Sequence, residues 1–253
     1  MRIRRRLRQA VARTRALFHK HYRLSGYRAL AAPDKIVHLG VDDIAYHVDD
    51  KVLRGRIPAG AVLASFPDLE TFTAFRGRDR KIDSVVRHFT RGVPWRETEL
   101  FTHQYTERLT RENVRGFTSL AGLEDFYKRV YDPLFEDLRR NGIDASGFGD
   151  RHEPLLVHIS KDGEFIWCST GKHRLAMCLV LGIDPVPVRV HARHRAWQER
   201  REAALEAVLA GRPVPHEIAA HPDMQDIVGP EDARLAVPAA LPLKAAGLSR
   251  RAR

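Results

Sequence analysis

The stretch EPLLVHISKDGEFIWCSTGKHRLAMCLVLGIDPVPVRVHARH, residues 153–194, predicts a compact unit of three strands and one helix. Residues 155–159 form a short apolar run with β-branched members, which is typical of a strand. Lys161-Asp162-Gly163 favours a tight turn. Residues 164–168 therefore return as the second strand of a hairpin.

The second half of the unit is a helix followed by a strand. Apolar residues repeat at helical spacing at Leu175, Ala176, Leu179 and Val180. Ser169 or Thr170 is expected to cap this helix, and Gly182 to end it. Because Pro185 prevents the helix from resuming, residues 187–190 predict the third strand.

The turn before this helix is the main candidate site. The free N–H groups and positive dipole end of a helix start favour an anion, and the side chains here add donors. We therefore predict a nucleotide-phosphate site, to which Lys172 would also contribute in catalysis by stabilising charge. The predicted phosphate site comprises Thr170, Gly171, Lys172, His173 and Arg174. For His173, the alternative is a structural residue bonded to the backbone.

The sequence GKHRLAMCLVLGIDPVPVRV resembles the core of the ParB/sulfiredoxin superfamily. Members carry a Gly-x-[Arg/His]-Arg turn, a helix of small and aliphatic residues, and a Pro-Val strand. Gly171, His173 and Arg174 match that turn. The resemblance is close over residues 153–194 and extends loosely back to Asp83. It implies an α+β fold, a small mixed sheet flanked by helices, and a bound nucleotide, ATP or CTP, with Mg²⁺.

Departures from the family pattern argue against two of the family's activities. Lys172 stands where sulfiredoxin has its catalytic cysteine, and Cys168 falls on the expected strand, where a small buried hydrophobe is the simpler interpretation. The chain after Arg195 is too short and rich in Ala and Pro for the helix-turn-helix and dimerisation domains of ParB. Nucleotide binding remains, with NTP hydrolysis or phosphoryl transfer to a small molecule or protein as the activities to test.

Outside this unit the patterns are weaker. Strands are expected over residues 35–39 and 61–66, and helices over residues 82–89, 123–138 and 196–210, with Pro133 kinking or splitting the second helix. The expected organisation is a basic helical arm over residues 1–30 and a single domain over 31–200. Residues 201–253 would form a helix and then a Pro- and Ala-rich, partly disordered basic tail.

The positive charge is concentrated in the arm. Residues 1–30 contain ten of the 43 Lys and Arg residues and no acid, and apolar residues recur at helical spacing between Ile3 and Phe18. Such a helix can bind nucleic acid, lie on an anionic membrane surface, or pack on its own domain. No apolar run is long enough for a transmembrane span. With only two cysteines, the composition favours a cytoplasmic protein, with nucleoid or membrane-surface association left open.

A second candidate lies in Pro94-Trp95-Arg96-Glu97-Thr98. A carboxylate can hold Mg²⁺ or orient an attacking oxygen, so Glu97 is the predicted catalytic residue, as a metal-holder or a base. In the alternative interpretation, Trp95 anchors the helix through residues 100–109, and Thr98 or Glu97 caps that helix. The sequence leaves both open.

Basic residues follow the third strand. Arg193 is expected near the phosphates, or else in a solvated basic turn that caps the helix over residues 196–210. His191 and His194 are three residues apart, but no second pair stands at a metal-ligand spacing, so no metal site is predicted. The alternative to a nucleotide-binding protein is a non-catalytic DNA- or RNA-binding protein, which would use the arm and the turn at Gly171 on backbone phosphates. The oligomeric state is not readable from the sequence.

Overall fold

The computed structural model describes residues 26–33, 35–49, 57–66, 69–143 and 155–229. The predicted arm helix between Ile3 and Phe18 and the tail beyond residue 229 lie outside these ranges. Residues 26–30, at the end of the expected arm, are not helical. Ala29 is buried there, and its backbone N–H donates to Glu202 Oε1 at 2.7 Å.

The predicted hairpin is confirmed. Strand β5 (Leu155–Ile159) pairs antiparallel with β6 (Phe165–Trp167), and Val157 stands opposite Trp167. Gly163 in the turn has φ +97°, and a Cβ there would lie 2.6 Å from the Trp197 ring. Glycine is therefore needed in this turn for conformation and for space.

Strand β7 (Val186–His194) is longer than expected and organises one half of the sheet. It pairs parallel with β5, antiparallel with β1 (Ile36–Leu39) and parallel, near its end, with β3 (Ala61–Leu63). The solvated turn expected after the strand is therefore wrong, because His191 and Arg193 lie within β7 and are buried. The helix cap expected there is confirmed, because His194 Nδ1 accepts from the N–H of Ala196 at 3.1 Å.

Two short strands complete the other half of the sheet and were missed by the sequence patterns. Strand β2 (Ile44–His47) runs parallel to β6, and β4 (Glu70–Thr71) pairs antiparallel with β2. The order is β1-β7-β5-β6-β2-β4, with β3 beside β7. The predicted α+β class with a mixed sheet is confirmed.

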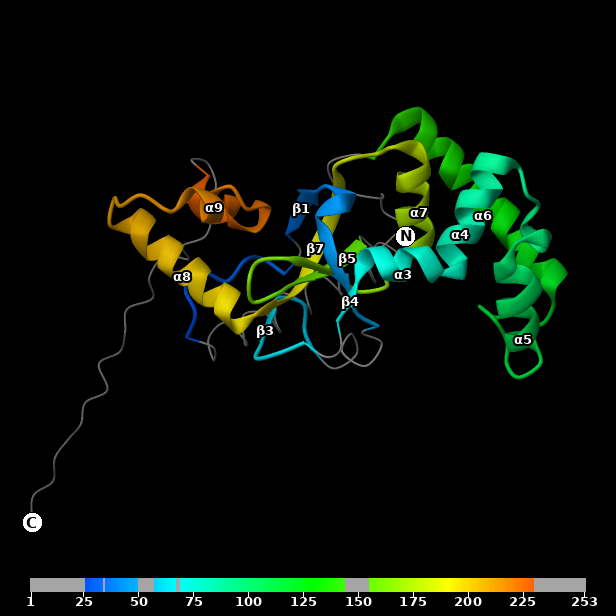
Figure 1. The fold of residues 1–253 in the computed structure, drawn as a ribbon, viewed down its shortest axis with the longest axis horizontal. Coiled ribbons are helices and arrows are strands. Elements are labelled where there is room, and N and C mark those ends of the chain that lie inside the picture. The colour runs from blue at the N-terminus through cyan, green and yellow to red at the C-terminus, as the bar shows by residue number, and fades with distance from the viewer. Residues whose placement is uncertain (1–25, 34, 50–56, 67–68, 144–154, 230–253) are drawn as a thin grey trace, which may run out of the picture.

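Helices lie on both sides of the sheet (Figure 1). One group contains α3 (Phe72–Arg78), α4 (Arg80–Arg91), α6 (Leu120–Asn141) and α7 (Lys172–Leu181). Ser119 caps α6 by accepting from the N–H of Gly122 at 3.2 Å. Helix α6 continues through Pro133, so the expected split there does not occur.

The other group covers the opposite side (Figure 1). It contains α8 (Arg195–Leu209), α9 (His216–Ala219), the 3₁₀ turn η4 (Pro222–Met224) and α10 (Gln225–Val228). Asp223 in η4 is fully buried and receives two bonds from Arg193, from Nε at 2.8 Å and Nη2 at 2.5 Å. Arg201 of α8 lies 3.2 Å from the same carboxylate. This ion cluster fastens residues 222–228 to the sheet.

Across the described ranges, no helix combines the length and apolar character that crossing a membrane requires.

Candidate functional site

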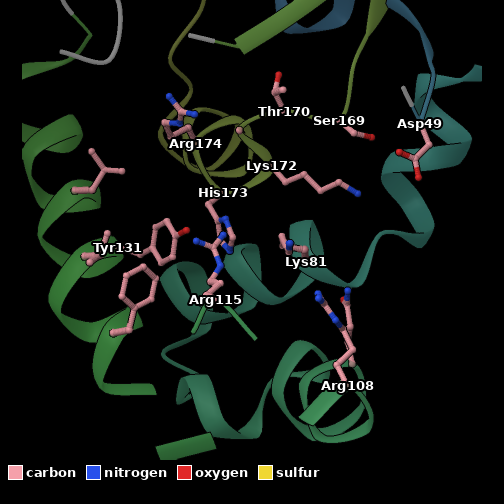
Figure 2. Close-up of a pocket in the computed structure, with 15 residues that line it drawn as sticks. Asp49, Lys81, Arg108, Arg115, Tyr131, Ser169, Thr170, Lys172, His173 and Arg174 are labelled. Atoms are coloured by element: carbon pink, nitrogen blue, oxygen red, sulfur yellow. The ribbon is translucent and has the colours of Figure 1, made fainter. Parts of the chain in front are cut away.

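The turn between β6 and α7 opens onto a cavity of about 560 Å³ (Figure 2). Residues 169–174 line it together with side chains from α4, α5 (Thr106–Leu109), α6 and the loop before α6. Five of the lining side chains are cationic: Lys81, Arg108, Arg115, Lys172 and Arg174. Asp49 is the one carboxylate among the lining residues. We call this space the cation cavity.

The turn before α7 requires glycine at position 171, both for its backbone conformation and for space. Its φ is +64°, and a Cβ there would lie 2.5 Å from Leu155 Cδ2 and 3.1 Å from Arg174 Nη2. Gly171 occupies the N-cap position of α7 without a side-chain cap, so the expected capping by Ser169 or Thr170 is wrong. Thr170 Oγ1 instead accepts from the N–H of Leu156 at 2.8 Å, which ties the turn to β5.

Lys172 and the start of α4 meet at one carboxylate. Lys172 Nζ lies 2.5 Å from Asp79 Oδ2, while Asp79 Oδ1 accepts from the N–H groups of Lys81 and Ile82, both at 3.0 Å. Lys172 Nζ also lies 4.6 Å from the centre of the Phe75 ring. The ammonium group is therefore held at the junction of two helix starts.

His173 is buried and serves as a structural anchor. Its Nε2 lies 2.8 Å from the Tyr127 hydroxyl, which in turn lies 2.5 Å from the Tyr105 hydroxyl. The imidazole stacks on Tyr131 with ring centres 4.1 Å apart. Burial lowers the pKa of His173 well below its ordinary value, and the nearby cations add to the effect. Of the two interpretations of His173, the structure favours the structural one, although its partners are side chains and not backbone.

Arg174 lines the cavity from another direction. In Figure 2 it lies on the opposite side of α7 from Lys172 and points away from Lys81 and Arg108. Its Nη2 lies close to Gly171, since a Cβ added to that glycine would be 3.1 Å from this nitrogen. The four predicted residues 171–174 thus share the cavity, but they face it from different directions.

Three of the cavity's cations were missed by the sequence patterns. Burial lowers the pKa of Lys81 from 10.5 to about 8, and repulsion from Arg115 and Lys172 adds to this shift. Arg115 has φ +54° and packs its guanidinium 5.8 Å from the Tyr131 ring centre. Arg108 reaches the cavity from α5. These three residues form no motif in the sequence, and only the packing of α4, α5 and α6 brings them together.

Two predicted site residues lie elsewhere. Arg193 is not among the lining residues, and its buried guanidinium is bonded to Asp223. Glu97 ends the 3₁₀ turn η2 (Trp95–Glu97), does not line the cavity, and lies 3.7 Å from Arg96 Nε with a side chain 59% exposed. The sequence around Arg193 and Glu97 could not show that these two side chains lie away from the cation cavity, because their surroundings depend on the tertiary fold.

The anchor interpretation of Trp95 is confirmed. Its ring is fully buried, stacks on His88 at 3.9 Å and donates from Nε1 to Asp132 at 2.8 Å. Thr98 does not cap a helix with its side chain, because Oγ1 donates to the carbonyl of Trp95 at 2.6 Å. The chain then continues as a π-helix, η3 (Leu100–Tyr105), and as α5.

Neither a cluster of metal ligands nor a similar known protein indicates what the cation cavity binds. Within the described residues, no three His, Cys, Asp or Glu side chains are grouped so that they could hold a metal ion. Comparison of the chain with protein-family models, curated proteins and solved structures finds no match.

Proposed function

We propose that the cation cavity binds the phosphate chain of a nucleotide, ATP or CTP, in the manner of the ParB/sulfiredoxin superfamily that the turn at Gly171 resembles. One observation carries this proposal: five cationic side chains converge on a cavity of about 560 Å³ with one carboxylate among its lining residues. Like charges repel at close range, and an anion among them relieves that repulsion. The helix dipole of α7 adds to the attraction.

Lys81 supports a ligand that carries several negative charges. Its lowered pKa, about 8, reflects burial and repulsion by Arg115 and Lys172. Holding a protonated lysine in such surroundings is costly unless a counter-ion is present. A di- or triphosphate chain would meet Lys81 and Arg115 together with Arg108, whose Nε already pairs with Glu112 at 2.8 Å. A single monoanion would leave more of this charge uncompensated.

The remaining wall suits the nucleoside. Four side chains of α6 form this wall, two aliphatic and two aromatic: Phe126, Val130, Tyr131 and Leu134. Ligand sites of 300–1,000 Å³ commonly combine apolar walls with a few convergent polar groups. A base or ribose packed on α6 would leave the phosphates at the start of α7.

Mg²⁺ would enter this site with the phosphates. Mg²⁺ keeps several waters and usually takes one or two protein carboxylates along with substrate phosphates. Asp49 lines the cavity and is the carboxylate placed to join such a complex, whereas Glu97 is not. Asp79 is already paired with Lys172. Hydrolysis or phosphoryl transfer would follow from this arrangement as a second proposal, measured by phosphate release.

A thermal-shift panel of nucleoside mono-, di- and triphosphates with Mg²⁺ tests the proposal. We expect triphosphates to raise the melting temperature most. Arg108→Ala should abolish most of the shift, because a charge-assisted contact contributes about 1.5–3 kcal/mol. Arg111→Ala is the matched control, because Arg111 lies outside the cavity and pairs with Glu107 at 3.1 Å.

Binding measurements with duplex DNA and RNA at several salt concentrations test the nucleic-acid alternative. Duplex DNA and RNA, bound with an affinity that falls steeply with salt, would favour a nucleic-acid binder. If no nucleotide stabilises the full chain, or if Arg108→Ala and Arg111→Ala behave alike, the nucleotide proposal fails.

A further inference from the structure

Ser169 has a backbone conformation that serine seldom adopts. Its φ is +56°, and among the described residues Arg115 is the other non-glycine residue with positive φ. The left-handed region costs an L-residue about 1–2 kcal/mol, and such strain concentrates at functional sites. Ser169 lies in the short connection between β6 and α7, with Gly171 two residues on. In the Gly-x-Ser-x-Gly motif, a sharp strand-to-helix turn exposes a nucleophilic serine. This turn has the Ser-x-Gly half of the motif and has Trp167 in place of the first glycine.

The side chain of a buried histidine, His47, lies within hydrogen-bond distance of the Ser169 hydroxyl. The Nε2 atom of His47 lies 2.5 Å from Ser169 Oγ. The imidazole is fixed by stacking on Phe75, with ring centres 3.6 Å apart and an interplanar angle of 16°. His47 ends β2 and pairs with Trp167 of the parallel strand β6, so the sheet brings base and serine to the same edge. The contact links residues 122 positions apart in the sequence.

A carboxylate lies on the other side of the imidazole. Glu70 of β4 is paired directly with His47 of β2, and its Oε2 lies 3.9 Å from His47 Nδ1. Arg78 holds Glu70 through two bonds, from Nε at 2.9 Å and from Nη2 at 2.5 Å. In the tautomer that carries its proton on Nδ1, toward Glu70, the imidazole presents an unprotonated Nε2 to the serine hydroxyl. This is the order of groups that activates a serine nucleophile.

The charges around His47 keep it in its basic form. Burial lowers the pKa of His47, and Lys172 of α7 lowers it further, whereas Glu70, Asp49 and Asp79 act in the opposite direction. The net effect is a neutral imidazole at neutral pH. A neutral imidazole is the state that accepts a proton from Ser169.

We propose that Ser169 is a nucleophile that attacks phosphorus, with His47 as its general base and Glu70 as a positioning residue. Ser169 lines the cation cavity beside Lys172, so the electrophile is a phosphate ester or anhydride held there. This step rests on the proposed phosphate site. The Oγ–P bond forms as the bond between phosphorus and the leaving oxygen breaks, and that oxygen keeps the electron pair. The serine proton passes to His47 Nε2 and then to the leaving oxygen.

An alkyl fluorophosphonate tests the nucleophile without needing a nucleotide. Attack by Oγ on its phosphorus expels fluoride, and intact-mass measurement with peptide mapping locates the adduct. We expect a single adduct at Ser169 of the full chain. His47→Gln should slow its formation at least about 100-fold, because general-base catalysis commonly contributes 10²–10⁴-fold. Ser160→Ala, at a buried serine bonded to Glu164, is the control and should label normally.

Three further readouts exclude a merely structural role. Ser169→Gly should lose the adduct yet melt no lower than the parent, because glycine relieves the positive φ. Glu70→Gln should lower the pH at which labelling is half-maximal, because the carboxylate stabilises protonated His47. Pyrophosphate should slow labelling by occupying the cation cavity.

Labelling elsewhere, or equal rates in His47→Gln and the parent, would overturn the proposal. So would full-rate labelling of protein that calorimetry shows to be saturated with pyrophosphate. A chain that labels at Ser169 but is stabilised by no nucleotide would instead refute the proposed nucleotide while keeping the nucleophile.

Discussion

Lys172 and Asp79 form an ion pair of 2.5 Å that joins the first residue of α7 to the N-cap of α4. The Asp79 side chain is 11% exposed and that of Lys172 22% exposed, so the pair is well shielded from water. Asp79 thus neutralises one of the five cavity cations while it caps the helix that carries another, Lys81. An incoming anion must compete with Asp79 for Lys172.

Asp79→Asn should tighten anion binding. Asparagine caps helices about as well as aspartate, so α4 should remain folded, whereas the charge that competes for Lys172 is lost. We expect a several-fold lower dissociation constant for pyrophosphate by isothermal titration calorimetry. Asp83→Asn removes an equivalent charge from α4 outside the cavity, where Asp83 pairs with Arg87 at 2.9 Å. Equal affinities in the two variants would contradict the competition.

Lys81 should make anion binding dependent on pH. Its pKa of about 8 means that the free site loses this charge as the pH rises through that value. A bound anion stabilises the protonated amine and raises its pKa, so binding near pH 8 should take up protons and affinity should fall above it. Calorimetry in two buffers of different ionisation enthalpy measures this uptake.

Lys81→Arg is the control for that titration, because an arginine stays charged over this range. Ionisation of pyrophosphate itself contributes equally in both proteins and cancels in the difference. Identical proton uptake in the parent and in Lys81→Arg would show that Lys81 does not titrate on binding.

Gly171→Ala should destabilise the protein more than Gly182→Ala does. Both glycines have φ +64°, so the conformational cost of alanine, about 1–2 kcal/mol, is common to both. A Cβ at Gly171 would also lie 2.5 Å from Leu155 Cδ2, while Gly182 has open space. Overpacking of this kind costs about 1–3 kcal/mol more. Urea unfolding of the two variants measures the difference, and equal losses would disprove the close approach.

Asp223→Asn should lower the free energy of unfolding by about 3–5 kcal/mol, because it leaves Arg193 buried without its counter-charge and leaves Arg201 with Asp226 alone, at 2.7 Å. Asp162→Asn is the exposed control: Asp162 is 55% exposed and lies 3.7 Å from Arg200, so we expect a loss below about 1 kcal/mol. Denaturant titration compares the two, and similar losses would contradict a stabilising role for the buried cluster.

The lowered pKa of Asp223 should make the folded protein less stable in acid. Burial alone would raise the pKa of Asp223, but Arg193 and Arg201 hold it well below the ordinary 3.8. A lowered pKa contributes stability that is present above the ordinary value and is lost as the pH falls below it. The parent should therefore lose more stability than Asp223→Asn between neutral pH and acid, measured by unfolding at each pH.

The local unit could be predicted from sequence because its signals are local. The Gly163 turn, the helical repeat after Gly171 and the stop at Gly182 each depend on neighbours a few residues away. Strands β2 and β4 were missed because they have four and two residues, too few for a periodic pattern, and are held by pairing across the sheet. The extension of β7 to His194 depends likewise on its pairing with β3.

The sequence by itself determined that a helix starts after Gly171 with cationic residues beside it, because this pattern is written in consecutive residues. It could not separate Arg193, which packing commits to Asp223, from Arg108 and Arg115, which packing brings to the cavity. Nor could it pair Ser169 with His47, because parallel strands join residues distant in the chain. Local chemistry fixed the turn, and the tertiary fold decided which charges and which base surround it.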